Sequence, residues 1–229
     1  MTRDETIADV LPPRGRLAGS DVLVAAPTGD SLRGIPERVL TAGAGPGDGA
    51  VVVSTRHRGS VVDERLADRT PLSADRIGVV DCTPGGNGRR RNGDDLKWAV
   101  NSPGDLTGSG IAVEECVSAL GNRGIDRVHV LFDTLSTLLV SVEVGAVLQY
   151  VHHLTTGAEP PAGIGVYPVH TNVLDERDLA RLEHLFDASV EVRRRDGARQ
   201  VRRRGFDAPL SEWVPLEPDR QEPRAPVSD

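Results

Sequence analysis

A glycine-containing turn follows the first apolar run of the chain, at a place where phosphate groups could bind. Phosphate-binding loops present backbone N–H groups at a helix N-terminus, and they add a lysine for the terminal phosphates and a serine or threonine for magnesium. In the turn over residues 26–36, Gly29 and Gly34 have the spacing of the two glycines of such a loop. However, Ile35 and Pro36 stand where the lysine and the hydroxyl residue should follow. The turn therefore lacks the side chains that contact the phosphates and the metal.

A second alignment of this turn gives the same result. If Ala26 begins the loop, Leu32 and Arg33 occupy the two positions. Asp30 would add negative charge beside the phosphate oxygens, and Lys97, which is the only lysine, lies far along the chain. We interpret the turn as a vestigial nucleotide pocket, and an ordinary turn is the alternative. Its candidate residues are Thr28, Gly29, Asp30, Ser31, Arg33 and Gly34.

Two polar residues end later apolar runs. Asp133 could either bind a metal or cap the helix expected after it. His170 ends another run, and a single histidine at such a place favours a structural role. The pair His152-His153 and the two cysteines, Cys82 and Cys116, do not have the spacing of metal ligands. The sequence therefore predicts no metal site, and it predicts that both cysteines are small buried residues.

Alternating apolar and amphipathic segments indicate how these residues are positioned. Runs typical of buried strands cover residues 21–27, 50–54, 76–81, 127–133 and 163–170. Helical patterns cover residues 35–42, 60–68, 110–120, 135–154 and 175–186. This order predicts right-handed strand–helix–strand units and an α/β fold with a mainly parallel twisted sheet and flanking helices.

The end of the chain has a different pattern. Strands over 189–193 and 199–206 flank Asp196-Gly197, a dipeptide that strongly favours a hairpin turn. We therefore expect a C-terminal antiparallel hairpin. Residues 83–108 are rich in glycine, asparagine and arginine and read as irregular. The predicted organisation is a flexible segment over 1–19, one domain over 20–207 and a disordered tail over 208–229.

Two stretches of this sequence resemble a known family. The run from Val128 to Leu139 resembles the Walker B strand of the RecA/KaiC family, and the run from Leu182 to Arg193 resembles its closing helix and strand. The stretch from Ser102 to Gly108 also has a counterpart in KaiC-like proteins. The resemblance covers residues 20–206 and is greatest to uncharacterised KaiC-like proteins of halophilic archaea. It implies a RecA/KaiC-like fold.

The resemblance also implies roles for single residues. Asp133 matches the Walker B aspartate, which orients magnesium-bound water, and His170 stands where this fold places a nucleotide-sensing polar residue. The catalytic glutamate of the family follows the second strand, but the corresponding residues 54–58 contain no carboxylate. Without the lysine and the base, positioning and charge stabilisation of phosphoryl transfer are both lost. We therefore expect no hydrolysis, no catalytic residue and no cofactor, although Arg33, Arg56 or Arg58 could support weak ATP binding.

Composition limits the environment and the partners. The net charge is −7 and nearly all basic residues are arginine, which is typical of salt-loving archaea and also of GC-rich genomes. This charge argues against nucleic acid as the main partner. The first residues do not resemble a signal peptide, and no apolar run reaches the ~18 residues of a membrane span. A cytoplasmic protein without membrane contact is predicted.

The predicted function is a non-hydrolysing regulatory or scaffold module, which acts by association with a protein partner or with further copies of itself. One alternative is an atypical ATPase with an arginine in place of the lysine. Another is a DNA-associated accessory protein that uses the arginine-rich hairpin. The arginines concerned are 89–91, 193–195 and 202–204, and their charge is diluted by Glu191, Asp196 and Asp207. Charged residues on edge strands also serve to prevent aggregation.

Overall fold

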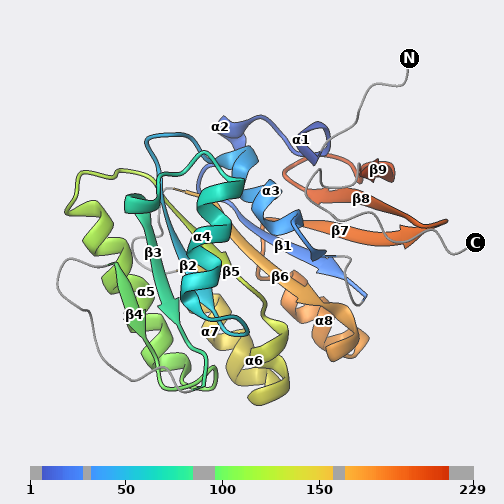
Figure 1. The fold of residues 1–229 in the computed structure, drawn as a ribbon. Coiled ribbons are helices and arrows are strands. Elements are labelled where there is room, and N and C mark those ends of the chain that lie inside the picture. Colours follow the sequence, from blue (N-terminus) through green and yellow to red (C-terminus); the bar gives the residue numbers. More distant parts are fainter. Residues whose placement is uncertain (1–6, 28–31, 85–95, 157–162, 217–229) are drawn as a thin grey trace, which may run out of the picture.

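A single sheet organises the molecule (Figure 1). The computed structural model describes residues 7–27, 32–84, 96–156 and 163–216. Nine strands lie in this part of the chain, in the order β4-β3-β2-β5-β6-β1-β7-β8-β9. Neighbours from β4 to β7 pair in parallel, whereas β7–β8 and β8–β9 are antiparallel. The strands are β1 Asp21–Ala26, β2 Gly49–Ser54, β3 Ile77–Asp81, β4 Lys97–Ala99, β5 Val128–Phe132, β6 Gly165–His170, β7 Ala188–Arg195, β8 Ala198–Gly205 and β9 Val214–Leu216.

Helices cover both faces of the sheet. The helices are α1 Ile7–Val10, α2 Arg14–Leu17, α3 Ile35–Gly43, α4 Gly59–Arg69, α5 Leu106–Gly121, α6 Ser136–Ser141, α7 Val144–Thr156 and α8 Glu176–Glu183. Residues of α1–α4 share one apolar cluster with the sheet, and residues of α5–α8 share the other. In β2, Ala50 and Val52 belong to the first cluster, whereas Val51 and Val53 belong to the second. Because successive side chains point to opposite faces, a strand buried on both sides must be apolar throughout.

The segment before β1 departs from the prediction. The sequence predicted a flexible lead-in over 1–19, which is wrong for residues 7–10 and 14–17, because they form α1 and α2. Ile7, Val10 and Leu17 are buried in the first apolar cluster. The Arg14 guanidinium donates to the Gly43 carbonyl at 2.9 Å and to Asp48 Oδ2 at 2.6 Å. Residues 1–6 lie outside the described part.

Asp48 also joins this segment to the sheet through a buried histidine. His129 Nδ1 accepts from the Ile164 N–H at 3.0 Å, so Nε2 carries the proton and donates to Asp48 Oδ2 at 3.1 Å. Burial lowers the pKa of His129, and the hydrogen bond to Asp48 only partly offsets that effect. The neutral ring therefore connects β5, the residue before β6 and the turn before β2.

Three smaller predictions also need correction. The stretch 83–108, predicted to be irregular, contains β4 with a buried Trp98. Three residues are too few to show the alternation of apolar and polar residues that marks a strand. The helical pattern over 135–154 is two helices, since Val142 is extended (φ −135°, ψ 150°). The tail predicted over 208–229 contains β9, because Leu216 is buried and β9 pairs with β8; residues 217–229 lie outside the described part. Of the described helices, none is long and apolar enough to cross a membrane.

The first residue of β1 has a carboxyl group with an altered acidity. Asp21 accepts a hydrogen bond from Tyr167, and its backbone N–H donates to Asp187 Oδ2 at 2.8 Å. Burial is the main cause that raises the pKa of Asp21 from 3.8 to about 7; the Tyr167 bond opposes it and the charge of Asp187 adds to it. Between these two values the folded chain holds a proton that the unfolded chain has lost.

This difference makes the wild-type protein lose stability as pH rises from 3.8 through about 7. Asp21→Asn has no proton to lose, so its melting temperature should rise relative to that of the wild type as pH increases from 3.8 to about 7. Thermal melts followed by circular dichroism measure the gap. The exposed Asp126→Asn serves as the control and should keep a constant gap. Parallel curves for Asp21→Asn and the wild type would contradict the expectation.

Candidate functional site

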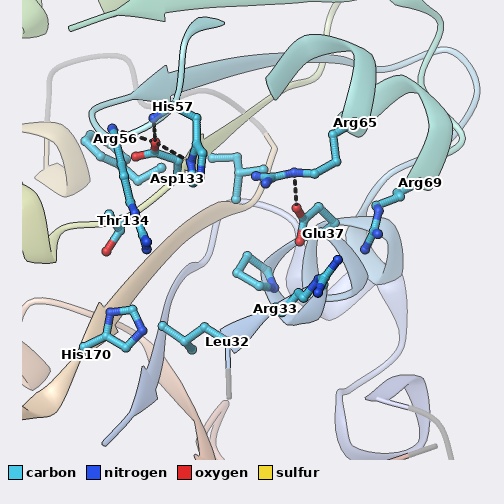
Figure 2. Close-up of a pocket in the computed structure, with 14 residues that line it drawn as sticks. Leu32, Arg33, Glu37, Arg56, His57, Arg65, Arg69, Asp133, Thr134 and His170 are labelled. Carbon is cyan, nitrogen blue, oxygen red and sulfur yellow. Dashed lines mark hydrogen bonds and ion pairs between the residues drawn. The ribbon is translucent and has the colours of Figure 1, made fainter. Parts of the chain in front are cut away.

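A cavity of about 380 Å³ opens at the carboxyl ends of the parallel strands. The start of α3, the loop between β2 and α4, helix α4 and the ends of β5 and β6 contribute its walls (Figure 2). Ligands of open parallel sheets bind at this edge, so the place agrees with the predicted pocket. Four of the predicted pocket residues line it, namely Arg33, Gly34, Asp133 and His170. Residues 28–31, which include Thr28, Gly29, Asp30 and Ser31, lie outside the described part.

The carboxylate of Asp133 is held by the β2–α4 loop. Its side chain is 1% exposed. Oδ1 accepts from the Thr55 N–H at 3.0 Å and from the Thr55 hydroxyl at 2.7 Å. Oδ2 accepts from the N–H groups of Arg56 and His57 at 2.9 and 3.2 Å. The Ser54 hydroxyl lies 3.4 Å from Oδ2 as a weaker fifth contact, so the donors fill the roughly four lone-pair positions that a carboxylate offers.

These donors determine the charge state of Asp133. Burial acts to raise its pKa, but the hydrogen bonds from His57, Thr55 and the Arg56 backbone outweigh burial and lower the pKa below 3.8. The carboxylate is therefore ionised, and it fixes the conformation of a loop that lies far away in sequence. Asp133 does not cap the next helix, because the N-cap of α6 is Leu135 and no side chain caps it. The capping role considered from sequence is wrong.

Arginines dominate the rest of the cavity. Arg33, Arg56, Arg65 and Arg69 line it together with one further carboxylate, Glu37. The Arg65 Nε atom lies 2.9 Å from Glu37 Oε1, and the Glu37 side chain is 6% exposed. Figure 2 shows Arg33, Arg65 and Arg69 around Glu37, whereas Arg56 points toward Thr134. Four guanidinium groups therefore face two carboxylates, one of which is already held by backbone donors.

The residue just before helix α3, at the edge of this cavity, has an unusual backbone conformation. Gly34 is the N-cap of α3 with φ 71°, a conformation that residues other than glycine rarely adopt. No side chain caps this end of the helix. The N-terminus of α3, where the helix dipole is positive, thus adds to the positive potential of the cavity.

Sequence reasoning missed several of these residues. Glu37, His57, Arg65 and Arg69 were not predicted as site residues, although all four line the cavity. Arg65 and Arg69 are four positions apart on α4, so they share one face of that helix. That spacing was a visible signal, but the sequence did not reveal that this face of α4 lies opposite the start of α3. Of Arg33, Arg56 and Arg58, the three alternatives considered for weak ATP binding, Arg58 does not line the cavity.

Comparison with known proteins gives this arrangement its family. A profile described as a family of unknown function, DUF7504, matches residues 19–192, which are most of the chain. The chain belongs to this family. No curated protein matches the DUF7504 chain in sequence.

Solved structures show which fold the DUF7504 chain shares. The KaiC-like protein PH0186 from Pyrococcus horikoshii OT3 has a TM-score of 0.59 at 13% identity, and the match covers 95% of each chain. Uncharacterized protein PH0321 from Pyrococcus horikoshii, crystallised with an unknown peptide, has a TM-score of 0.58 at 16% identity over 82% of this chain and 84% of that one. The flagellar accessory protein FlaH from Methanocaldococcus jannaschii has a TM-score of 0.48 at 12% identity, over 81% and 77%. The match to PH0186 confirms the predicted RecA/KaiC-like α/β fold.

Two other residues considered from sequence can now be placed in the DUF7504 chain. Lys97 lies on β4 and pairs with Asp63 at 2.9 Å, at the end of the sheet away from β1. It does not line the cavity. His170 lines the cavity, and it also fixes the start of α6, because its backbone N–H donates to Ser136 Oγ at 2.8 Å. His170 is the last residue of β6, and its contact with Ser136 is structural.

The arginine hairpin of the DUF7504 chain makes contacts within the fold. Arg202 donates to Glu191 at 2.8 and 2.5 Å, and Arg193 and Arg202 lie over the Trp213 ring at 4.0 and 4.5 Å. The buried Arg199 donates to the Arg33 carbonyl at 2.6 Å and so links the hairpin to the cavity. These arginines thus already serve the fold; residues 89–91 lie outside the described part.

Proposed function

We propose that this DUF7504 protein is a non-hydrolysing RecA/KaiC-like module that acts by protein association. The observation that carries the proposal is the state of Asp133. Its carboxylate accepts four hydrogen bonds from residues 55–57, so the residue that matches the Walker B aspartate is used to hold a loop. A carboxylate in this state has no lone pair left for a metal-bound water.

Magnesium, which the fold family implies, does not fit the residues of this cavity. Magnesium prefers six oxygen ligands in near-octahedral geometry, supplied by carboxylates, hydroxyls and phosphates. Asp133 and Glu37 are the two carboxylates among the described lining residues, and the hydrogen bonds from residues 55–57 already occupy Asp133. Glu37, the second carboxylate of the cavity, lies 2.9 Å from Arg65. The positively charged lining of the cavity therefore suits an anion and not a metal cation.

The catalytic base and the lysine are also missing from the described cavity. The segment at the end of β2 reads Ser54-Thr-Arg-His-Arg58. The N–H groups of residues 55–57 and the Thr55 hydroxyl donate to Asp133, and the Ser54 hydroxyl donates to the His57 carbonyl. Phosphoryl transfer depends on a positioned nucleophile and on charge stabilisation by metal and lysine. With none of these groups in place, we expect no turnover.

Two observations support association as the mode of action. The strand β4 is at one end of the sheet, and among the described strands it pairs only with β3, so we expect a partner's strand to add at its other edge. In addition, PH0321, which shares the fold, was crystallised with an unknown peptide. That complex supports our proposal that the partner of this chain is a protein segment. Light scattering tests whether that partner is a second copy of this chain. Self-association would give a mass above the 24.4 kDa of one chain.

Phosphate release from magnesium-ATP tests the absence of hydrolysis. We expect the purified protein to release phosphate no faster than the buffer blank, at low salt and in molar KCl. Arg56→Ser removes a cavity arginine, and Arg58→Ser removes its neighbour outside the cavity. Release that Arg56→Ser abolishes and Arg58→Ser retains would contradict the proposal, because the activity would then belong to this cavity.

The arginine content of the cavity favours a second candidate, an atypical ATPase in which arginine replaces the lysine. Four arginines line the cavity and could contact phosphate oxygens. The two candidates differ in the need for magnesium and in turnover, so the release assay separates them.

A further inference from the structure

We propose that the arginine-lined cavity binds a small phosphorylated molecule through guanidinium groups and without a magnesium ion. The inference rests on the proposed function, since a site that hydrolysed magnesium-ATP would need Asp133 for the metal. The proposed function names no small-molecule ligand, and the inference assigns one to the cavity.

The charge of the cavity points to an anion. Among the described residues that line the cavity, Arg33, Arg56, Arg65 and Arg69 outnumber Glu37 and Asp133 by two, in a chain whose net charge is −7. Arg65 and Arg69 stand four residues apart on α4, where like charges repel. Clefts lined by one sign of charge concentrate the opposite ion. A cluster of this kind is stabilised when an oxyanion binds between the guanidinium groups.

Arg65 provides an independent observation. Its Nε atom is buried and has no hydrogen-bond partner, although Glu37 Oε1 lies 2.9 Å away, so the N–H does not point at that oxygen. Buried donors in native proteins are almost always satisfied. An oxygen acceptor in the cavity would satisfy this donor.

The start of α3 adds further donors to the same wall. Gly34, Pro36 and Glu37 line the cavity, and no side chain caps the helix. Pro36 has no N–H to donate, but the other first-turn N–H groups of a helix have no partner within the helix and favour anions. The helix is nine residues long, so its dipole is developed. Guanidinium groups and helix N–H groups thus act on one volume.

Size and geometry favour phosphate groups on a small molecule. Arginine presents a planar fork that binds phosphate oxygens with two hydrogen bonds. The cavity of about 380 Å³ lies within the range of small-molecule sites and exceeds the volume of a single phosphate ion. Because the four donors occupy Asp133, the charge of the ligand must be neutralised by arginine and not by a metal.

Isothermal titration calorimetry with sodium pyrophosphate tests the inference. The protein is titrated in EDTA and again in excess magnesium chloride, as wild type, Arg56→Ser and Arg33→Ser. Arg58→Ser is the matched control, because Arg58 is exposed and lies two residues from Arg56 but outside the cavity. Thermal melts establish that every variant is folded.

We expect pyrophosphate to bind in EDTA and magnesium not to tighten binding. Each cavity variant should weaken binding about tenfold or more, as expected for loss of a charge-assisted hydrogen bond, whereas Arg58→Ser should bind like the wild type. Absence of binding in EDTA, binding that requires magnesium, or equal loss in Arg58→Ser would each overturn the inference.

The outcome remains distinct from that of the proposed function. Phosphate release from magnesium-ATP, measured on the same samples, would overturn the proposed function. If neither release nor pyrophosphate binding occurs, only the inference fails.

Discussion

Asp133→Asn is expected to lower the free energy of unfolding by about 3 kcal/mol. The substitution removes hydrogen bonds to a charged carboxylate, and it places one hydrogen-bond donor against others. The asparagine amide would place an NH₂ group against the N–H groups of residues 55–57, which donate to the carboxylate in the wild type. The loop between β2 and α4 would then lose the group that holds it. Urea unfolding followed by circular dichroism measures the change.

The same variant should also change the response to acid. The pKa of Asp133 is lower in the folded chain than the usual 3.8, so the carboxylate stabilises the fold above 3.8 and this contribution is lost as pH falls through the lowered value. The difference between the wild type and Asp133→Asn should therefore shrink in acid. Asp126→Asn, which makes the same exchange at an exposed position, should stay within about 0.5 kcal/mol of the wild type. An equal loss in both variants would show that the hydrogen bonds of Asp133 do not stabilise the loop.

Gly163→Ala should lower the free energy of unfolding by about 3 kcal/mol through steric overlap. A Cβ atom on Gly163 would overlap the Val128 carbonyl oxygen, and it would lie 2.5 Å from the Val128 carbonyl carbon and 2.8 Å from the His129 nitrogen. These are backbone atoms at the start of β5, so they cannot move as a side chain could. The shift would separate β5 from β6, which pair at Val130 and Gly165. Urea unfolding with Gly163→Ala gives the comparison.

Gly145→Ala makes the same exchange where space is open. Gly145 is exposed on α7, and a Cβ atom there would meet nothing within 4 Å. Alanine favours a helix by up to about 1 kcal/mol over glycine, so this control should be neutral or more stable than the wild type. A stable Gly163→Ala protein would show that β5 and β6 tolerate a wider separation.

The fold was predictable from sequence because each central strand is an apolar run between polar turns. The hairpin followed from Asp196-Gly197, whose φ angles of 52° and 78° suit the turn that this dipeptide favours. The short elements were not predictable from local pattern. Helix α1 has only four residues, and its stability comes from Ile7 and Val10 packing on the core.

The candidate site was predictable in position and only partly in composition. Strand ends at one edge of a parallel sheet converge, so Asp133 and His170 could be placed near each other. The role of Asp133 could not be predicted, because its donors lie 76 to 78 residues away in sequence. Arg65 and Arg69 look like ordinary surface residues of an amphipathic helix until α4 is packed beside α3.

The two tryptophans of the chain sit at opposite ends of the nine-stranded sheet, and this makes each end visible to fluorescence separately. Trp98 on β4 is 4% exposed, and its indole N–H donates to Glu115 at 3.0 Å. Trp213 lies close to β9 under the guanidinium groups of Arg193 and Arg202. Replacing either indole by phenylalanine leaves a single emitter, so the opening of the β4 edge and the release of the hairpin can be timed independently in one unfolding experiment.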